Sequence, residues 1–193
     1  SSDLRNGEFY VPERLSLDSH THLERLGMET TLHSMRHTFA TQAGRMTRDE
    51  LLETAVALAG EAGRLAHLVR HDPHQRTYEL LHHDSEVMAW LICWSGPDHD
   101  TGFHDHDVSS GAVRVVDGAL IESSPRIGGE AVSRMVPAGQ SFSFGPDHIH
   151  RLAAHGERSV SLHAYSPPLW RLGGYAIDRD GVMRRMSISY ADE

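Results

Sequence analysis

The pattern of hydrophobic and polar residues changes once along the chain, near residue 72. Up to that point, leucine, alanine and charged residues recur at the three- and four-residue spacing of amphipathic helices. We expect one helix over residues 30–42. A second helix should begin at Thr47, because Thr47 and Glu50 have the spacing of a capping box. Residues 29–72 are therefore predicted to form a helical layer.

After residue 72, short runs of β-branched and aromatic residues alternate with turn residues, which is typical of antiparallel β structure. Asp117-Gly118 and Asp180-Gly181 are hairpin signals, and the second would join residues 175–178 to residues 183–189. We expect a mainly β fold over residues 76–190. The other predicted strands are residues 76–82, 87–94, 112–116, 119–123, 131–136, 140–144 and 160–165.

Length and charge narrow the class of protein. A chain of 193 residues fits one domain, so we expect the helical layer and the β part to form a single domain over residues 1–193. The chain has 27 acidic and 18 basic residues and a formal charge of −9, which disfavours nucleic acid and anionic membranes as partners. Cys93 is the single cysteine, which excludes an intrachain disulfide. We expect a cytoplasmic protein that binds a small molecule, and the sequence leaves its oligomeric state open.

Histidine is unusually frequent, with 16 in the chain, and its neutral ring is the commonest protein ligand for transition metals. A His-x-His pair on a strand places both rings on one face. Chance alone gives on the order of one such pair at this frequency, so context must decide. The pair at residues 20 and 22 lies outside the strand region and is interpreted as a solvated surface pair. The three pairs are His20/His22, His104/His106 and His148/His150.

The context of the second and third pairs resembles the two cupin motifs. Residues 102–106 followed by Gly118 resemble the first motif, and residues 145–152 resemble the second, which supplies one more histidine. Gly111 stands where most cupins have a metal-binding glutamate. The resemblance implies an antiparallel, jelly-roll-like β-barrel and a metal site made of three histidines without a carboxylate.

A more specific resemblance covers roughly residues 76–168. Cys93-Trp94, then Ile149-His150-Arg151-Leu152, then Ser161-Leu162-His163-Ala164-Tyr165-Ser166-Pro167-Pro168 resemble the cysteine dioxygenase family of thiol dioxygenases. The family implies non-heme Fe(II) as cofactor and O2 as cosubstrate, with His104, His106 and His150 as ligands. His150 is preferred to His148 on the Ile-His-Arg-Leu match, although both rings point the same way from a strand and His148 stays open. His99 and His155 are expected to be loop residues rather than ligands.

The resemblance also implies a reaction. Three neutral imidazoles leave the full charge of the metal uncompensated, which attracts a thiolate. The family delivers both oxygen atoms to sulfur and gives a sulfinic acid. Ser161, His163 and Tyr165 alternate along one predicted strand and so share a face. The family match assigns Tyr165, held by Ser161 and His163, to hydrogen-bonding the substrate or the oxygen.

Two departures from the family bear on crosslinking and substrate. Animal cysteine dioxygenases carry a cysteine crosslinked to the tyrosine, and Gly111 occupies that place, so no crosslink can form. Residues 80–85 resemble the corresponding strand of the family's 3-mercaptopropionate branch, and if the match is anchored there, the carboxylate-binding position falls on Tyr78. A tyrosine cannot form the charged fork of an arginine. We therefore expect a substrate other than cysteine, with 3-mercaptopropionate or a cationic thiol-imidazole such as ergothioneine as candidates. Arg76 becomes the carboxylate anchor if the register shifts by two, and that alternative would restore a cysteine-like substrate. The substrate-binding candidates are Tyr78, Arg76 and Trp94.

Two other functions use the same residues. The three histidines suit zinc, nickel or manganese in a cupin that catalyses isomerisation, hydrolysis or lysis. A non-catalytic cupin that binds a small molecule is the other alternative. The Ser161, His163 and Tyr165 set argues against pure binding, because binding alone does not need it.

Overall fold

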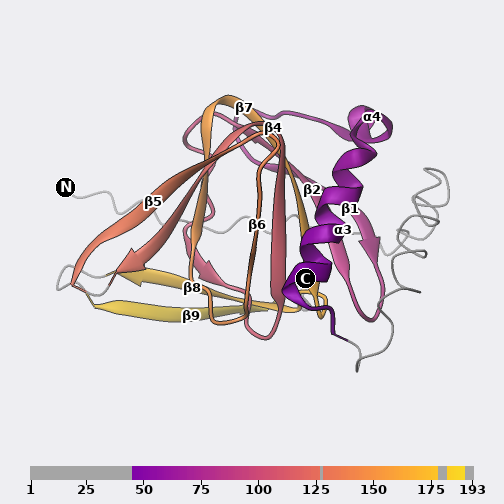
Figure 1. Ribbon diagram of the computed structural model, residues 1–193. Helices are drawn as coiled ribbons and strands as arrows, with labels where there is room; N and C mark the ends of the chain where they lie inside the picture. Colours follow the sequence, from indigo (N-terminus) through magenta and orange to yellow (C-terminus); the bar gives the residue numbers. More distant parts are fainter. Residues whose placement is uncertain (1–44, 127, 178–181, 190–193) are drawn as a thin grey trace.

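Two antiparallel sheets form most of the chain in the computed structural model, which describes residues 45–126, 128–177 and 182–189 (Figure 1). The helix expected over residues 30–42 and the His20/His22 pair lie outside these residues. The helices are α3 (Arg48–Gly60), α4 (Ala62–Leu65) and the 3-10 helix η1 (Ala66–Leu68). The strands are β1 (Thr77–His83), β2 (Met88–Ser95), β3 (Phe103–Asp105), β4 (Ser110–Arg126), β5 (Gly129–Pro137), β6 (Ser141–Phe144), β7 (Arg151–Ser166), β8 (Arg171–Ile177) and β9 (Met183–Ser189).

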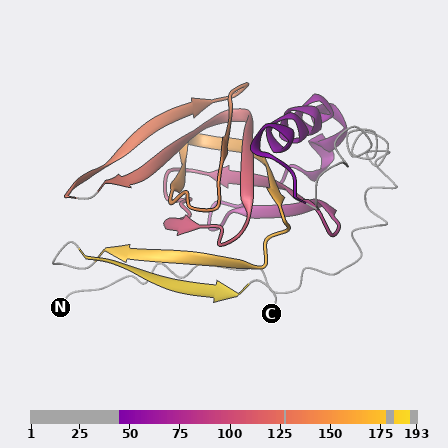
Figure 2. The same ribbon diagram turned by 60° about the horizontal axis from the view of Figure 1, so that its bottom comes forward.

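The larger sheet has six strands in the order β1-β2-β7-β4-β5, with β6 paired to β4, and the smaller sheet has the order β3-β8-β9. Figure 2 shows the β8–β9 ribbon running beneath the larger sheet. The predicted mainly β, antiparallel architecture is confirmed. The sheets do not close into a continuous barrel. Within the described part of the chain, an isolated bridge at His104↔His150 links β3 to the residue before β7, and another at Asp100↔Ala153 links the β2–β3 connection to β7.

Strand β2 is buried on both faces, which explains its unbroken apolar sequence. Met88, Trp90, Ile92 and Trp94 face the interior between the sheets. The alternate residues Ala89, Leu91 and Cys93 face outward and pack under Leu58, Leu65 and Leu68 of the helical layer. The lone cysteine is thus a packing residue beneath the helices.

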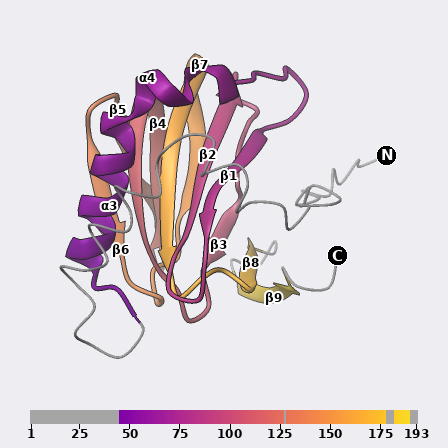
Figure 3. The same ribbon diagram turned by 90° about the vertical axis from the view of Figure 1, so that its right-hand side faces the viewer.

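Helix α3 begins where the sequence predicts. The Glu50 N–H donates to Thr47 Oγ1 at 3.3 Å, and the Thr47 N–H donates to Glu50 Oε2 at 2.6 Å, so the capping box is confirmed. Leu51 and Ala55 then pack against Ala112 of β4 and Ala164 of β7. The small alanines let the helix lie close against the outer face of the larger sheet (Figure 3).

The hairpin predicted at Asp117-Gly118 is wrong. Residues 112–116 and 119–123 belong to one strand, β4, whose register with β7 shifts on both sides of Asp117. Gly118 has a positive φ of 67°, but Asp117 does not, whereas a type I′ hairpin needs both. A single left-handed glycine instead makes a bulge, which bends the strand without ending it. A Cβ at Gly118 would collide with the Arg158 carbonyl oxygen.

The bend brings both ends of the β4–β7 pair to one place. Gly111 pairs with Tyr165 before the bend, and Glu122 pairs with Leu152 after it. Ser159 joins the strands at the bend, because its hydroxyl donates to the Ala119 carbonyl at 2.7 Å and accepts from the Ala119 N–H at 3.2 Å. Two strands therefore form two walls of the interior.

Asp105 fastens the smaller sheet together. Its carboxylate accepts from the Tyr175 hydroxyl at 2.5 Å, from Arg185 Nε at 2.8 Å and from the Gly173 N–H at 3.1 Å. Burial raises the pKa of Asp105, but the hydrogen bonds from Arg185 and Tyr175 outweigh it and lower the pKa to about 2. The ionised side chain holds β3 on the β8–β9 ribbon, and its neighbours His104 and His106 are left to point the other way.

No helix in the described ranges is long and apolar enough to cross a membrane. The single domain over residues 1–193, the cytoplasmic location and the lack of nucleic-acid and membrane partners stay predictions. The same holds for the small-molecule partner.

The turn between β1 and β2 is held by an aspartate and a histidine. Asp84 Oδ2 accepts from His82 Nε2 at 2.6 Å, and Oδ1 accepts from the N–H groups of Glu86 and Val87 at 2.7 and 3.0 Å. Burial raises the pKa of Asp84, but these hydrogen bonds and the charge of His82 lower it well below its ordinary value. A carboxyl group whose pKa is lower in the folded than in the unfolded protein stabilises the fold at pH values above its ordinary pKa. This stabilisation is lost as the pH falls through the pKa of the folded state.

We therefore predict that Asp84→Asn lowers the free energy of unfolding by about 1–2 kcal/mol at pH 7. The difference from wild type should shrink below about pH 4, where the Asp84 carboxyl of the unfolded chain begins to bind its proton while that of the folded protein is still ionised. Urea unfolding at pH 7 and at lower pH measures both effects, and Asp117→Asn at an exposed position is the control. A difference that does not change with pH would contradict the prediction.

Candidate metal centre

Three imidazoles meet in the interior, between the two sheets. His104 lies on β3, His106 follows directly after it, and His150 precedes β7. The ring centroids of His104 lie 4.8 Å from both others, and those of His106 and His150 lie 5.2 Å apart. One nitrogen of each ring falls within 4.8 Å of the others. All three side chains are buried.

A reciprocal pair of backbone hydrogen bonds sets this geometry. The His104 N–H donates to the His150 carbonyl at 2.8 Å, and the His150 N–H donates to the His104 carbonyl at 3.0 Å. Residues paired directly in this way point their side chains to the same side of the sheet. His106 joins them because it lies two residues beyond His104.

The ring nitrogens are arranged as metal ligands require. His104 Nδ1 donates to the Gly102 carbonyl at 3.0 Å and His150 Nδ1 donates to Glu122 at 3.1 Å, which leaves a lone pair on Nε2 of each ring. His150 Nε2 and His106 Nδ1 are buried, and neither has a hydrogen-bond partner among the described residues. An unpaired buried nitrogen is costly, and a metal ion would satisfy it. The donor set fits a transition metal.

Electrostatics keep these rings neutral. Burial, followed by the neighbouring His150, lowers the pKa of His104 to about 3. Burial and the other imidazoles lower the pKa of His106 well below its ordinary value, and burial also lowers the pKa of His150. A neutral imidazole keeps the lone pair that a metal needs. The cluster is therefore ready to bind a cation over the physiological pH range.

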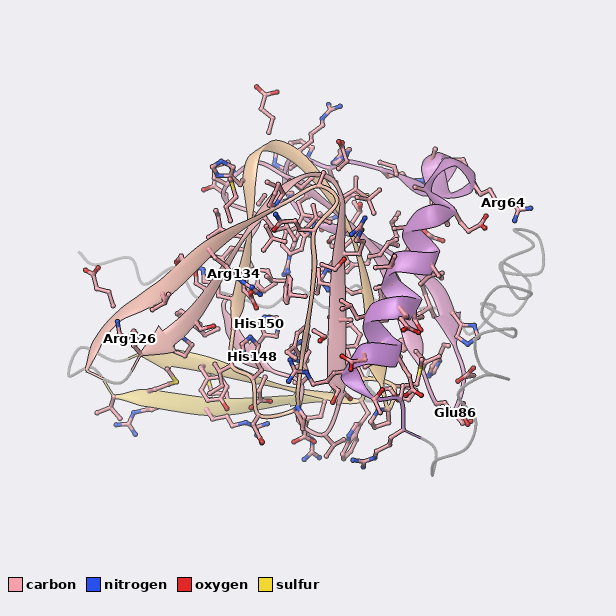
Figure 4. The ribbon with its side chains drawn as sticks, in the orientation of Figure 1. Arg64, Glu86, Arg126, Arg134, His148 and His150 are labelled. Atoms are coloured by element: carbon pink, nitrogen blue, oxygen red, sulfur yellow. The ribbon has the colours of Figure 1, made fainter. Side chains whose placement is uncertain are left out.

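The structure separates His148 from His150. His148 is half-buried and does not join His104 and His106; its Nε2 donates to Glu122 at 3.1 Å. Glu122, on β4, accepts from both histidines and from Arg134, whose Nε lies 2.6 Å from Oε2. Burial raises the pKa of Glu122, but these three hydrogen bonds lower it well below the ordinary range. Figure 4 shows Arg134, His148 and His150 side by side.

A chain of hydrogen bonds leads along β7 toward the imidazole cluster. The Trp94 indole N–H donates to Ser161 Oγ at 2.9 Å, Ser161 Oγ lies 2.9 Å from His163 Nε2, and His163 Nδ1 lies 3.1 Å from the Tyr165 hydroxyl. Burial, followed by the other histidines, lowers the pKa of His163 to about 3. The Tyr165 ring lies 5.2 Å from that of His106. The strand alternation seen in the sequence thus brings Ser161, His163 and Tyr165 together.

The three substrate-binding candidates contact one another. The Arg76 guanidinium lies over the Tyr78 ring at 5.5 Å and over the Trp94 ring at 5.3 Å. Burial raises the pKa of Tyr78, and the charge of Arg76 partly offsets this. The same charge lowers the pKa of His104 and His163, so Arg76 acts on both the imidazole cluster and the relay. Arg76, not a ligand cation, occupies the ring faces.

Sequence reasoning missed Phe144 and Glu122, which complete the surroundings of the cluster. The Phe144 ring stacks on His106 at 4.6 Å and lies 4.7 Å from His150. It occupies the space above Gly111, where a Cβ would collide with the Phe144 ring and lie 3.0 Å from the Tyr165 ring. The pairing of Gly111 with Phe144 across two strands could not be read from the local sequence.

The two remaining histidines lie apart from the cluster. His99 is in the connection between β2 and β3, as expected, where its Nδ1 accepts from the Ser95 N–H at 2.8 Å. The expectation of a loop is wrong for His155, which is an exposed residue of β7. The bend at Gly118 lengthens β7 beyond the predicted residues 160–165 and takes in His155.

The antiparallel sheets and the inward cluster of imidazoles define a protein of the cupin class. Residues 27–178 match the model of the family described as cysteine dioxygenase type I. The chain belongs to this family, which confirms the resemblance seen in the sequence.

Solved structures match part of the chain at low sequence identity. A double-stranded β-helix domain protein from Klebsiella pneumoniae has a TM-score of 0.47 and 11% identity, over 63% of this chain and 92% of that one. A cupin superfamily protein from Desulfitobacterium hafniense has a TM-score of 0.47 and 12% identity, over 54% and 88%. KdgF from a Halomonas species has a TM-score of 0.41 and 20% identity, over 52% and 86%.

The close contact at Gly111 leads to a prediction. We expect Gly111→Ala to lower the free energy of unfolding by about 1–3 kcal/mol, because the added methyl group must displace the Phe144 ring. It should also weaken metal binding, since that ring stacks on His106. Thermal unfolding and metal titration measure the two effects. Gly129→Ala is the matched control, because a Cβ there meets no atom within 4 Å, and equal behaviour of the two variants would refute the prediction.

Proposed function

We propose that the protein is an iron(II)-dependent thiol dioxygenase, which adds both atoms of O2 to the sulfur of a small thiol and gives the sulfinic acid. The atoms balance with no other reductant, because RSH and O2 together make RSO2H. The observation that carries the proposal is the cluster of three neutral, buried imidazoles beside a tyrosine relay, in a chain of the cysteine dioxygenase type I family.

His104, His106 and His150 would hold the iron. When bound, ferrous iron would bind a thiolate and O2 and lower the pKa of the thiol. Three uncharged ligands suit this task, because they leave the attraction for an anionic sulfur undiminished. Phe144 and Tyr165 border His106, and their buried rings limit the access of bulk water to the reacting sulfur.

The relay orients the Tyr165 hydroxyl. An indole N–H only donates, so Trp94 occupies a lone pair of Ser161 and directs the serine proton toward His163 Nε2. The neutral His163 then donates from Nδ1 to the Tyr165 oxygen. Tyr165 can in turn donate its proton toward the oxygen atoms as negative charge develops on them.

Arg76 favours a substrate with a carboxylate. Its guanidinium is half-buried beside Tyr78 and Trp94 and supplies a positive charge there. Trp90 pairs with His163 across the strands, and its buried indole N–H has no acceptor in the described part of the structure. A carboxylate oxygen would satisfy such a donor. The two groups together support recognition of an anion.

Among thiol carboxylates, 3-mercaptopropionate fits best. The ammonium of cysteine and the permanent cation of ergothioneine would both meet the positive charge of Arg76, which already covers the ring faces of Tyr78 and Trp94. 3-Mercaptopropionate carries only the carboxylate. The proposal therefore keeps the expectation that cysteine is not the preferred substrate.

The test is anaerobic reconstitution with ferrous iron, followed by measurement of O2 uptake and sulfinate with cysteine, 3-mercaptopropionate, cysteamine and ergothioneine. We expect one O2 consumed per sulfinate and the highest kcat/KM with 3-mercaptopropionate. In the same assay Tyr165→Phe should lower kcat about 10–100-fold at unchanged iron content, because it removes a donor and not a ligand. Iron binding without O2 uptake for any thiol would contradict the function.

Arg76→Gln tests the substrate class separately. Loss of a charge-assisted hydrogen bond of about 2–3 kcal/mol should raise KM for 3-mercaptopropionate about 30–150-fold, with little change for cysteamine, which has no carboxylate. Arg64→Gln is the matched control, since Arg64, on α4, pairs with Glu61 and lies far from His150 in Figure 4. An equal loss for both thiols would show that Arg76 does not bind the carboxylate.

A further inference from the structure

We propose that Glu122 is a positioning residue for the metal, acting through His150. Its buried carboxylate fixes the ring orientation and the tautomer of His150 and makes that imidazole a stronger electron donor than the other two. The inference rests on the proposed function for the assignment of His150 as a ligand. It concerns a residue that the family's histidine motifs do not contain.

The contacts around Glu122 allow one arrangement of the His150 ring. An ionised carboxylate can only accept, so the 3.1 Å contact to His150 Nδ1 places the proton on that nitrogen. The lone pair then lies on Nε2, the buried nitrogen that has no partner among the described residues. His104 is held in the same way, but by the neutral carbonyl of Gly102. Glu122 thus differs from the support of His104 by a full negative charge.

A negative hydrogen-bond acceptor raises the basicity of the imidazole and so strengthens its bond to a metal. The centre has three neutral ligands, and Glu122 places a negative charge in direct hydrogen-bond contact with one of them. Arg134 limits the effect: two of its nitrogens lie 2.5 and 2.6 Å from Oε2, whereas Oε1 faces the histidines. The side chain of Arg134 is 60% exposed, so the contacts from Arg134 through Glu122 to His150 connect solvent with a proposed metal ligand.

Glu122 has a second possible role, as a ligand itself. Glu122, His148 and His150 also place three ligand atoms within 4.8 Å of one another. Three observations favour the positioning role. Arg134 already occupies Oε2, both histidines already bond to Oε1, and His148 is half-buried while His104 and His106 are buried. An ion at the second set would have to displace these bonds.

The experiment compares the metal affinity of variants with their stability. Fe(II) and Co(II) are titrated anaerobically into the full chain, and the Co(II) visible spectrum and the Tm of the metal-free protein are recorded. We expect Glu122→Gln to weaken binding of both metals about 10–100-fold and to shift the Co(II) bands, because the donor strength of His150 changes. Glu122→Asp, which keeps the charge, should bind metal more tightly than Glu122→Ala.

Glu86→Gln is the matched control, because it makes the same charge change at a residue far from His150 in Figure 4. It should leave affinity and spectrum unchanged. If Glu122→Gln lowers the Tm of the metal-free protein but leaves affinity and spectrum like those of the control, the residue is only structural and the inference is overturned. The Asp and Ala variants decide the case if the Gln variant does not fold.

His148→Gln and His104→Gln distinguish the two sets of ligands. We expect His104→Gln to abolish tight binding and His148→Gln to change it less than about threefold, since the latter is a partner of Glu122 and not a ligand. An equal loss in both would place the ion at Glu122, His148 and His150 and overturn the positioning role. None of these titrations uses a thiol. A protein that binds metal as expected but oxidises no thiol would refute the proposed function alone.

Discussion

The site depends on one pair of backbone hydrogen bonds, those between His104 and His150. His104 lies on β3 of the smaller sheet and His150 directly precedes β7 of the larger sheet, so their reciprocal N–H to carbonyl bonds link the two sheets where no continuous ladder exists. Because paired residues point the same way, the bonds also turn two imidazoles toward one point. Asp105 makes this possible from the other side of β3: by bonding to Tyr175 and Arg185, it holds the strand on its own sheet while the neighbouring rings face inward.

The second constraint is the bend in the β4–β7 pair. A left-handed glycine and the Ser159 hydroxyl turn the two strands together, so that one pair supplies residues on both sides of the imidazole cluster. Tyr165 comes from the first wall and Glu122 from the second. The cluster therefore lies between a hydroxyl relay and a carboxylate. The positive charge of Arg76, the residue before β1, also lowers the pKa of His104. Fixed charges of both signs thus lie around a cluster of neutral imidazoles.

Much of this could be predicted from local sequence, and the remainder could not for identifiable reasons. The capping box at Thr47 and the alternation of Ser161, His163 and Tyr165 depend on near neighbours, so spacing alone places them. Gly118 was misread because an Asp-Gly pair makes either a hairpin or a bulge, and the choice depends on the partner strand. Phe144 and Glu122 reach the cluster through pairing with distant strands, which leaves no local signal. Arg76 and Tyr78 share a face, so the sequence left open which of them meets the ligand.

The His104–His150 bridge also has a consequence for how the protein is made. During synthesis His104 and His106 leave the ribosome well before His150, and the strand that must pair with them follows later still. Contacts so distant in sequence form late in folding, because the loop between them must close first. With the proposed ligands, a metal ion would therefore have only two of its three nitrogen donors until His150 has been made and has paired with His104. Loading should be an event of the finished polypeptide, and any ion captured earlier would be held loosely enough to exchange.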